Sequence, residues 1–429
     1  MSTGALVVRN VRRITGLFAD PVRGLSLLEQ GLLSATNFAV ILTLARSFPE
    51  AHFGAFSFAY ISYMFLLNLH RSIVVVPFVI HTADREELKR EGRLWNSLNL
   101  LVMAACTLLL GLAAATVMPL GGREWMAQAL VAAMVFVPAG FLYEFLRRWI
   151  IQLHDPVRVV MAAVAYCAVY VLGLVWAIHT HAVFWAFAGF AAANLAAALV
   201  CLPKVLASRK GAPKPRSFRA FLAELGSYLS WSMLSNLAYN GYNHLPPLIL
   251  GFLAGPVPVA AYQAMRNFTQ PVMTLGTAID NFDKPRAARE MARNGLPGMK
   301  RQLRATTAAL FAMAGPYILL MLFFAPQAEA LVYGERYADY AYLMYFWIAF
   351  AVMNLAVYPF ETGLFLVKRP DLLFKGRIIG AVLCTIATLI LVPKMGVAGA
   401  MTGLLLGWVV SGLFAVFLLA KVTRCQAPN

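Results

Sequence analysis

Charged side chains are scarce in this sequence. Only 13% of its 429 residues are Asp, Glu, Lys or Arg, whereas 61% are hydrophobic. Soluble globular proteins are about 25% charged and about 45–50% apolar. The composition therefore excludes an ordinary soluble domain and indicates a chain that is largely embedded in lipid.

The motifs that hold metals, cofactors or nucleotides are also lacking. The five cysteines have neither metal-ligand nor disulfide spacing, and they fit best as small apolar residues. The histidines form no ligand set, and no zinc motif, phosphate-binding glycine loop or nucleophile elbow occurs in a suitable context. We therefore expect no resident cofactor and no metal. Energy would come from a gradient, the membrane potential or substrate supply, with H+ and Na+ both open as the coupling ion.

Positive charge is abundant, with a formal net charge of +17 at pH 7. The basic residues do not indicate nucleic-acid binding, because they lie in short segments between long apolar runs, where a cytoplasmic leaflet attracts them. Residues 1–24 hold Arg9, Arg12, Arg13 and Arg23 but lack the compact apolar stretch and cleavage site of a secretion signal. We expect them to form a basic cytoplasmic arm.

About twelve apolar runs are long enough to cross a membrane, since a bilayer core of about 30 Å needs about 20 helical residues. The runs lie near residues 25–47, 53–80, 96–119, 124–146, 156–178, 181–203, 226–253, 256–280, 305–329, 338–366, 373–393 and 396–420. They predict an all-α, polytopic membrane protein.

The connections between these runs alternate between rich and poor in Lys and Arg. The rich connections hold Arg85, Lys89, Arg90 and Arg93, then Arg147, Arg148 and Arg158, then the basic residues of 204–219, 284–304, 368–377 and 421–424. The poor connections hold only Arg46, Arg123, Arg336 and Lys394. Because cytoplasmic loops carry the excess of Lys and Arg, the rich connections and both termini are predicted to be cytoplasmic. The outer loops are short and leave little room for a catalytic domain.

A basic stretch with Gly and Pro divides the chain into two halves. Residues 204–225 are predicted to form a cytoplasmic linker between six-helix lobes at 25–203 and 226–420, with a tail at 421–429. At an offset of 206 residues, LARSFPEAHFGAF (44–56) aligns with LGFLAGPVPVAAY (250–262), and Asn37 aligns with Asn243. Six spans per half give both halves the same orientation, as in transporters with parallel repeats, so a substrate path is expected between them.

The step from the first span to the second contains Leu44-Ala45-Arg46, then Glu50, then Phe53-Gly54. With YEFLRRWIIQLHDP (143–156) and LVPKMGVAGAMTGLLLG (391–407), the stretch 27–78 resembles polysaccharide exporters and flippases of the multidrug/oligosaccharidyl-lipid/polysaccharide (MOP) superfamily. The resemblance implies a MATE/MOP-like, V-shaped bundle of two six-helix lobes. It also implies alternating access acting on undecaprenyl-pyrophosphate-linked glycans or a related exopolysaccharide intermediate. Twelve spans disfavour the fourteen-span lipid II flippases of this superfamily.

Arg266 is the most informative polar residue, because an intramembrane arginine is costly unless it faces a cavity or a partner. It can hold a pyrophosphate or an acidic sugar; it can also form an internal ion pair or snorkel. Amides at helical spacing accompany it and suit sugar hydroxyls, although such amides also join helices by hydrogen bonds. The predicted substrate-binding set is Arg266, Asn37, Asn236, Asn240, Asn243, Gln263, Asn267 and Gln270, with His244 beside it.

Five charged residues lie toward the inner ends of their predicted spans. Glu29, Arg71, Glu144, Asp280 and Glu361 are candidates for a cytoplasmic gate or for a proton- or cation-coupling site. Charges at helix ends also snorkel or pair locally, which gives these residues a structural alternative.

The sequence favours a transporter, not an enzyme, that flips or exports a lipid-linked oligosaccharide or polysaccharide precursor across the bacterial inner membrane. Its expected partners are the lipid-linked glycan, membrane lipids and other polysaccharide-assembly proteins, without nucleic acid. One alternative is a small-molecule or multidrug exporter of the same fold. A membrane enzyme of polysaccharide assembly is a further alternative, for which a large outer loop or a His/Asp constellation would be expected; the sequence offers neither.

Overall fold

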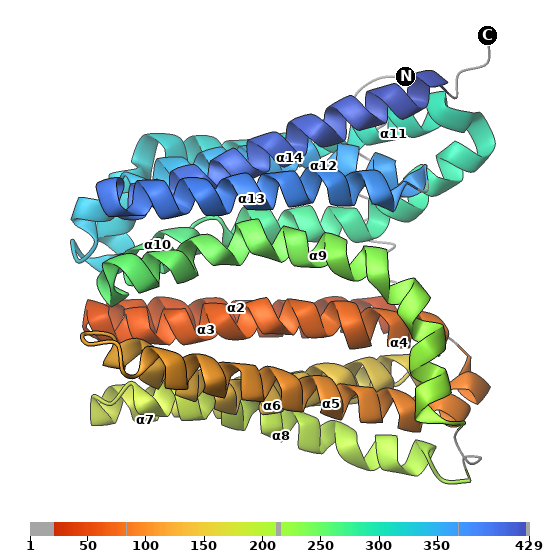
Figure 1. Cartoon of the computed structure of the whole chain (residues 1–429), viewed down its shortest axis with the longest axis horizontal. Coiled ribbons are helices and arrows are strands. Elements are labelled where there is room, and N and C mark those ends of the chain that lie inside the picture. The colour runs from red at the N-terminus through yellow and green to blue at the C-terminus, as the bar shows by residue number, and fades with distance from the viewer. Residues whose placement is uncertain (1–20, 83, 212–215, 368, 426–429) are drawn as a thin grey trace. The chain divides into compact units, whose positions relative to one another are not determined.

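The computed structural model describes residues 21–82, 84–211, 216–367 and 369–425, and every regular element within these ranges is helical (Figure 1). In order, the helices are α2 (Pro21–Ser47), α3 (Glu50–His70), the π-helix η1 (Arg71–Val75), α4 (Val76–His81), α5 (Arg85–Val117), α6 (Glu124–Gln152), α7 (Pro156–Thr180), α8 (Phe184–Ser208), α9 (Phe218–Ala254), α10 (Pro256–Asn267), α11 (Gln270–Tyr333), the 3-10 helix η2 (Ala338–Tyr340), α12 (Leu343–Leu366), α13 (Pro370–Met395) and α14 (Val397–Cys425). The predicted all-α class is confirmed.

Within the described chain, 10 helices are long and apolar enough to cross a membrane. They match all the predicted spans except 226–253 and 256–280, which lie on α9 and on α10 with the start of α11. Both of these stretches are helical, but they carry the asparagines, the glutamines and Arg266. The least apolar of the predicted spans are therefore the two that hold most of the candidate site.

The chain packs into two compact units whose boundaries cut across helices. Unit 1 contains Met1–Leu44, Ile73–Leu110 and Met134–Ala223, and unit 2 contains Ala45–Ser72, Gly111–Ala133 and Glu224–Asn429. Unit 2 therefore includes α3 from the first half of the sequence together with α10 from the second half. The lobe boundaries at 203 and 226 stay a prediction.

In unit 1, small residues let α7 and α8 approach closely. A Cβ atom on Gly173 would lie 2.6 Å from the Cα atom of Gly189. Close backbone approach of this kind is a common way for helices to associate in membranes, where the hydrophobic effect does not drive helices together. Aromatic packing adds a second contact region, in which the ring of Phe78 on α4 lies 4.9 Å from that of Phe145 and 5.6 Å from that of Trp149.

In unit 2, glycine contacts also set the closest helix pairs. A Cβ on Gly380 would lie 2.6 Å from the carbonyl oxygen of Gly407, which joins α13 to α14 (Figure 1). The same unit packs α12 against α11 and α14, and α3 against α10. At the α3–α10 crossing, a Cβ on Gly54 would lie 2.0 Å from the carbonyl oxygen of Pro256. These crossings leave no room for a larger residue.

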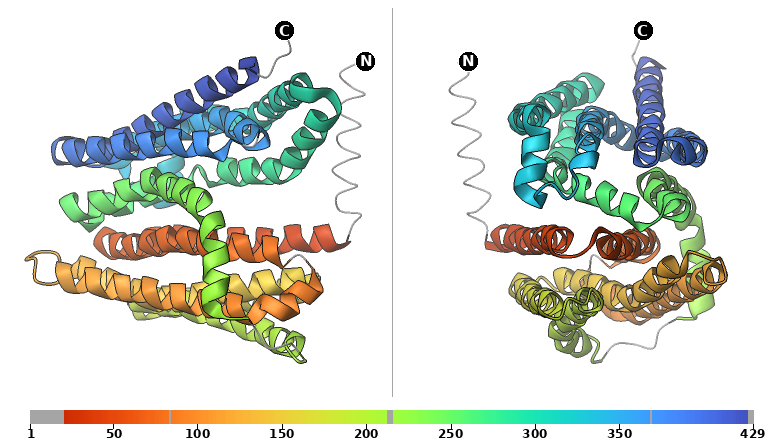
Figure 2. Two further views of the ribbon diagram at one scale, coloured as in Figure 1. Left: turned by 45° about the vertical axis from the view of Figure 1, so that its right-hand side comes forward. Right: turned by 90° about the vertical axis from the view of Figure 1, so that its left-hand side faces the viewer.

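Helix α11 consists of two arms joined by a turn. Gly295 has φ 62° and ψ −157°, a backbone conformation that residues with a Cβ rarely adopt, and the chain reverses there (Figure 2). Residues on both sides of the turn, including Ala287, Met299 and Leu303, pack in one apolar cluster with Leu364 of α12 and Leu373 of α13. The turn is thus anchored to the rest of unit 2.

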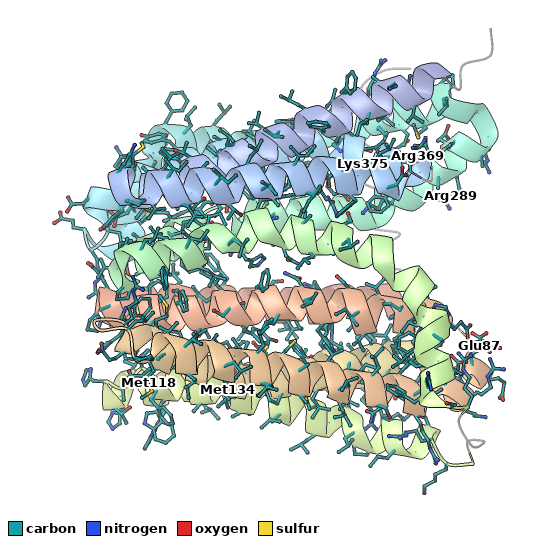
Figure 3. The ribbon with its side chains drawn as sticks, viewed as in Figure 1. Glu87, Met118, Met134, Arg289, Arg369 and Lys375 are labelled. Carbon is teal, nitrogen blue, oxygen red and sulfur yellow. The ribbon has the colours of Figure 1, made fainter. Side chains whose placement is uncertain are left out.

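Basic residues gather at this end of unit 2. Figure 3 shows Arg289 of α11 at the same end of the unit as Arg369 and Lys375, which flank the start of α13. These residues belong to two of the connections that the sequence predicts to face the cytoplasm. The structure therefore groups two sequence segments that the charge pattern had assigned to one side of the membrane.

Candidate functional site

Arg266 lies at an interruption between two helices. Helix α10 ends at Asn267 and α11 begins at Gln270. The hydroxyl of Thr269 donates to the Arg266 carbonyl at 2.7 Å, and the hydroxyl of Tyr317 donates to the Phe268 carbonyl at 2.7 Å. The Arg266 carbonyl also accepts the backbone N–H of Thr269 at 3.0 Å, so side chains add hydrogen bonds to the carbonyls at this interruption. The sequence predicted a single span here; the proline at position 271 was the available signal, because proline favours the first turn of a helix.

The guanidinium group of Arg266 is partly buried in unit 2. Its charge acts on Tyr60 of α3 and on Tyr239 and His244 of α9. No carboxylate among the described side chains forms an ion pair with it. Two helices, α3 from the first half of the sequence and α9 from the second, therefore bring aromatic and polar groups to this cation on α10. Sequence reasoning missed Tyr60, because nothing in the pattern places α3 beside α10.

The predicted polar stripe on α9 contains both buried and partly exposed side chains. Asn240 is 2% exposed, and its Oδ1 has no hydrogen-bond partner within the described structure. His244, one turn further along, is also buried and meets the ring of Phe65 on α3 edge to face at 6.3 Å. Asn236 lies one turn before Asn240 and is partly exposed. Asn240 thus offers an acceptor that a ligand hydroxyl could use.

Helix α10 presents a second polar stripe. Gln263 is 2% exposed, and within the described structure its Oε1 has no hydrogen-bond partner. Asn267 is also buried, but its Nδ2 donates to the hydroxyl of Tyr333 at 3.2 Å, and that hydroxyl donates to the Ala264 carbonyl at 3.0 Å. Gln270 is partly exposed at the start of α11. Gln263 therefore has an unsatisfied acceptor, whereas Asn267 braces the helix end.

The repeat-related residues Asn37 and Asn243 are both engaged within their own units. In unit 1, the hydroxyl of Tyr166 donates to Asn37 Oδ1 at 2.7 Å. In unit 2, Asn243 Nδ2 donates to the Tyr239 carbonyl at 2.8 Å, and Asn243 Oδ1 accepts from Trp408 Nε1 at 3.2 Å. These contacts give both asparagines a bracing role between helices.

In unit 1, Glu29 and Glu144 are paired with arginines. Arg147 Nε and Nη2 donate to the two carboxylate oxygens of Glu29 at 2.6 and 2.7 Å. Glu144 lies 3.6 Å from Arg147 and 3.4 Å from Arg148. Glu29 and Arg147 are 2% and 7% exposed, so this is a buried, bidentate ion pair between α2 and α6.

Unit 2 contains a comparable ion pair at Glu361. Arg377 Nη2 and Nε donate to Glu361 at 2.8 and 3.4 Å, and Arg377 Nη1 donates to the Ser235 hydroxyl at 3.2 Å. The cluster joins α9, α12 and α13. Ser235 is related to Glu29 by the same 206-residue offset that relates Asn243 to Asn37. Equivalent positions of the first helix of each half thus bind a buried arginine.

The other two candidates for gating or coupling are Arg71 and Asp280. Arg71 is the first residue of η1, and its charge acts on Tyr60, as that of Arg266 does. A single π-turn inside a helix often marks a functional site. The side chain of Asp280 lies outside the described residues.

Comparisons with known proteins agree with this architecture. Residues 232–364, which span most of α9 and α10–α12, match the MatE family model. An inward-facing multidrug resistance MATE transporter of the MOP superfamily has a TM-score of 0.68 with 14% identity, covering 94% of this chain and 99% of that one. The chain has the fold of a MATE-type transporter. This is a transporter fold rather than the fold of an enzyme.

Two further structures share the MATE-type fold. The lipid II flippase MurJ in an inward closed conformation gives a TM-score of 0.69 with 10% identity, covering 94% of this chain and 93% of that one. A MOP superfamily transporter from Pyrococcus furiosus gives 0.64 with 14% identity, covering 96% and 98%. No curated protein matches the sequence. At these identities the likeness concerns the fold alone.

Proposed function

We propose that this protein is a membrane transporter that flips or exports a lipid-linked oligosaccharide or polysaccharide precursor by alternating access, in the bacterial inner membrane. The observation that carries the proposal is Arg266, a cation at a broken helix that has no ion-pair partner among the described carboxylates. An intramembrane arginine costs about 2.5–3.5 kcal/mol on insertion scales. An anionic pyrophosphate or acidic sugar bound to it would offset that cost.

The groups near Arg266 support a substrate that carries hydroxyl groups. The unpaired acceptors on Asn240 and Gln263 lie in helices adjoining the cation, and Tyr60 contributes an aromatic ring. Amides and aromatic rings are the groups that bind and orient polar ligands in pockets. A phosphate held by Arg266 and sugar hydroxyls held by the amides would together fit a glycan linked to a lipid phosphate.

The placement of the buried carboxylates argues against a cationic drug as the substrate. Among the candidate carboxylates whose side chains the structure describes, Glu29 and Glu361 are each held by an arginine in a bidentate pair, and Glu144 contacts two arginines. A multidrug exporter is the alternative supported by the fold of the first similar structure. The transporter from P. furiosus is described as having a binding pocket of reverse polarity that suggests a different function, which makes pocket charge a reasonable discriminator on this fold.

The broken helix supports a transport cycle. Discontinuous helices near the membrane midplane occur at substrate sites in many transporters, where the ends of the half-helices face the substrate and its coupling ions. The break after Asn267 would let Arg266 move with α10 while α11 stays packed on α12. Glu29, Glu144 and Glu361, already paired, would then act in holding helices together rather than in binding a coupling ion.

A reconstituted flipping assay tests the substrate and the role of Arg266. Purified protein in vesicles would be given a fluorescent undecaprenyl-pyrophosphate-linked oligosaccharide or a fluorescent cationic drug. We expect flipping of the first and not of the second. Arg266→Ala should slow flipping by about 10- to 100-fold, the loss of a charge-assisted hydrogen bond of about 1.5–3 kcal/mol.

Lys394→Ala is the matched control, because Lys394 is an exposed cation near the end of α13. It should flip at the wild-type rate. Arg266→Lys keeps the charge and should retain part of the activity. Wild-type flipping by Arg266→Ala would remove Arg266 from the site, and transport of the drug alone would favour the multidrug exporter.

A further inference from the structure

The predicted outer connections hold only four cations, and two of them make contacts between segments from the two halves of the sequence. Arg336 lies in the turn between α11 and α12. Its Nη1 donates to the carbonyl of Phe48 and lies 3.5 Å from the carbonyl of Ala45. Both carbonyls are at the end of α2, where helix carbonyls lack intrahelical partners and carry partial negative charge.

The turn that carries Arg336 is held in a fixed conformation. Gly334 and Glu335 both have positive φ, 62° and 60°. The buried carboxylate of Glu329 accepts the backbone N–H of Tyr337 at 3.0 Å, and the Tyr337 side chain is fully buried. Burial raises the pKa of the Tyr337 hydroxyl, so this group stays neutral and adds no charge to the turn. These contacts hold the backbone of the turn in place, so that the Arg336 side chain lies against the end of α2.

Two further contacts within unit 2 also join segments from the two halves of the sequence. The guanidinium of Arg123, before α6, lies 3.8 Å from the ring centroid of Phe252 at the end of α9. Gly54 of α3 packs directly on the Pro256 backbone at the start of α10. All three contacts lie at helix ends that the charge pattern assigns to the outer side. The Gly54–Pro256 contact closes this end of α3 against α10, and the other two contacts join the two halves of the sequence on the same predicted side.

We propose that Arg336 is the latch of an outer gate, which ties the turn between α11 and α12 to the outer end of α2 and must leave the α2 carbonyls before this end of unit 2 can open. The proposal rests on the alternating access of the proposed function. A guanidinium on backbone carbonyls suits a reversible latch, because Arg336 is exposed and water can replace each hydrogen bond. The buried Glu29–Arg147 pair has no such replacement and would be costly to break.

Accessibility of Ser57 tests the latch. Ser57 lies one turn after Gly54 on α3 and is 1% exposed. Ser57→Cys would be labelled with a water-soluble maleimide on purified protein in nanodiscs, and the chain without this substitution would correct for the native cysteines. We expect slow labelling in the latched form. Adding Arg336→Gln should raise the labelling rate at least several-fold, and Arg336→Lys should give an intermediate rate.

Lys394→Gln is the matched control, since it removes another predicted outer cation that makes no ion pair within the described structure. It should leave labelling unchanged. Gly54→Ala should open the same end by a different route, because its Cβ would meet the Pro256 backbone. Size-exclusion profiles would verify that each variant is folded.

The outcomes separate the latch from the substrate. Unchanged labelling in folded Arg336→Gln would overturn the latch, whatever the protein transports. Equal acceleration by Lys394→Gln would also overturn it, because the effect would then be one of surface charge alone. Faster labelling in Arg336→Gln together with no flipping of a lipid-linked glycan would support the latch and contradict the proposed substrate.

Discussion

Arg147 and Arg377 are both buried, but they differ in the number of carboxylates beside them. Arg147 contacts Glu29 and Glu144, whereas Arg377 contacts Glu361 and the neutral hydroxyl of Ser235. Removing one partner of a buried pair is costly mainly because the remaining charge is left without compensation. The two sites should therefore respond differently when a glutamate is neutralised.

Glu361→Gln should lower the free energy of unfolding by about 3–5 kcal/mol, because Arg377 loses its carboxylate. Glu29→Gln should cost less, about 1.5–3 kcal/mol, because Glu144 still faces Arg147. Thermal unfolding of the purified protein in detergent measures both. The double variant Glu361→Gln/Arg377→Met should recover part of the loss, and a larger loss for Glu29→Gln than for Glu361→Gln would contradict the reasoning.

The sequence identified these glutamates but not their partners. Glu29 and Arg147 are 118 residues apart, and Ser235 and Arg377 are 142 residues apart. Hydropathy gives the length of a span and the depth of a residue in it, but not which face of the helix meets which neighbour. Arg266 could be found because its depth in an apolar run is unusual by itself; Tyr60 could not, because its position near Arg266 depends on the packing of α3 on α10.

At the scale of helices, the glycine contacts distinguish positions that look alike in sequence. Gly173 and Gly315 both lie in apolar helical runs. A Cβ on Gly173 would lie 2.6 Å from the backbone of Gly189, whereas nothing lies within 4 Å of a Cβ on Gly315. The first glycine is needed for the α7–α8 contact, and the second is not.

Gly173→Ala should therefore destabilise the protein by about 1–3 kcal/mol, the usual cost of overpacking. Gly315→Ala should be neutral or should stabilise by up to about 1 kcal/mol, because alanine favours the helix. Thermal unfolding of the two variants under one detergent condition provides the comparison. A Gly173→Ala variant as stable as the wild type would mean that α7 and α8 shift apart at little cost.

Most elements were predictable because spans of about 20 apolar residues are a strong signal. The break at Phe268–Thr269 was not predicted, since it interrupts a polar stretch where the hydropathy pattern is weak. The reversal at Gly295 lies within the predicted connection 284–304. The weakest spans by hydropathy were also those that hold most of the candidate site. The polar residues that form the candidate site are thus also the residues that weaken the hydropathy signal of these spans.

For the whole molecule, the orientation in the membrane remains a prediction from the charge pattern. A reporter enzyme or fluorescent protein inserted within 204–225 should report a cytoplasmic location, as the six basic residues of 204–219 predict. An insertion beside Lys394 should report the opposite side. If the linker were outside, Arg336 and Arg123 would lie at the inner face, and the latch would have to be reassigned to that side.

The short length of α10 has a mechanical consequence. The helix carries Pro256, packed on Gly54, at one end and Arg266 at the other, and it ends at Asn267. One 12-residue helix therefore carries both the α3 crossing and the candidate cation. An anion that binds Arg266 would contact the same short helix that α3 crosses, about ten residues, or some 15 Å, from that crossing.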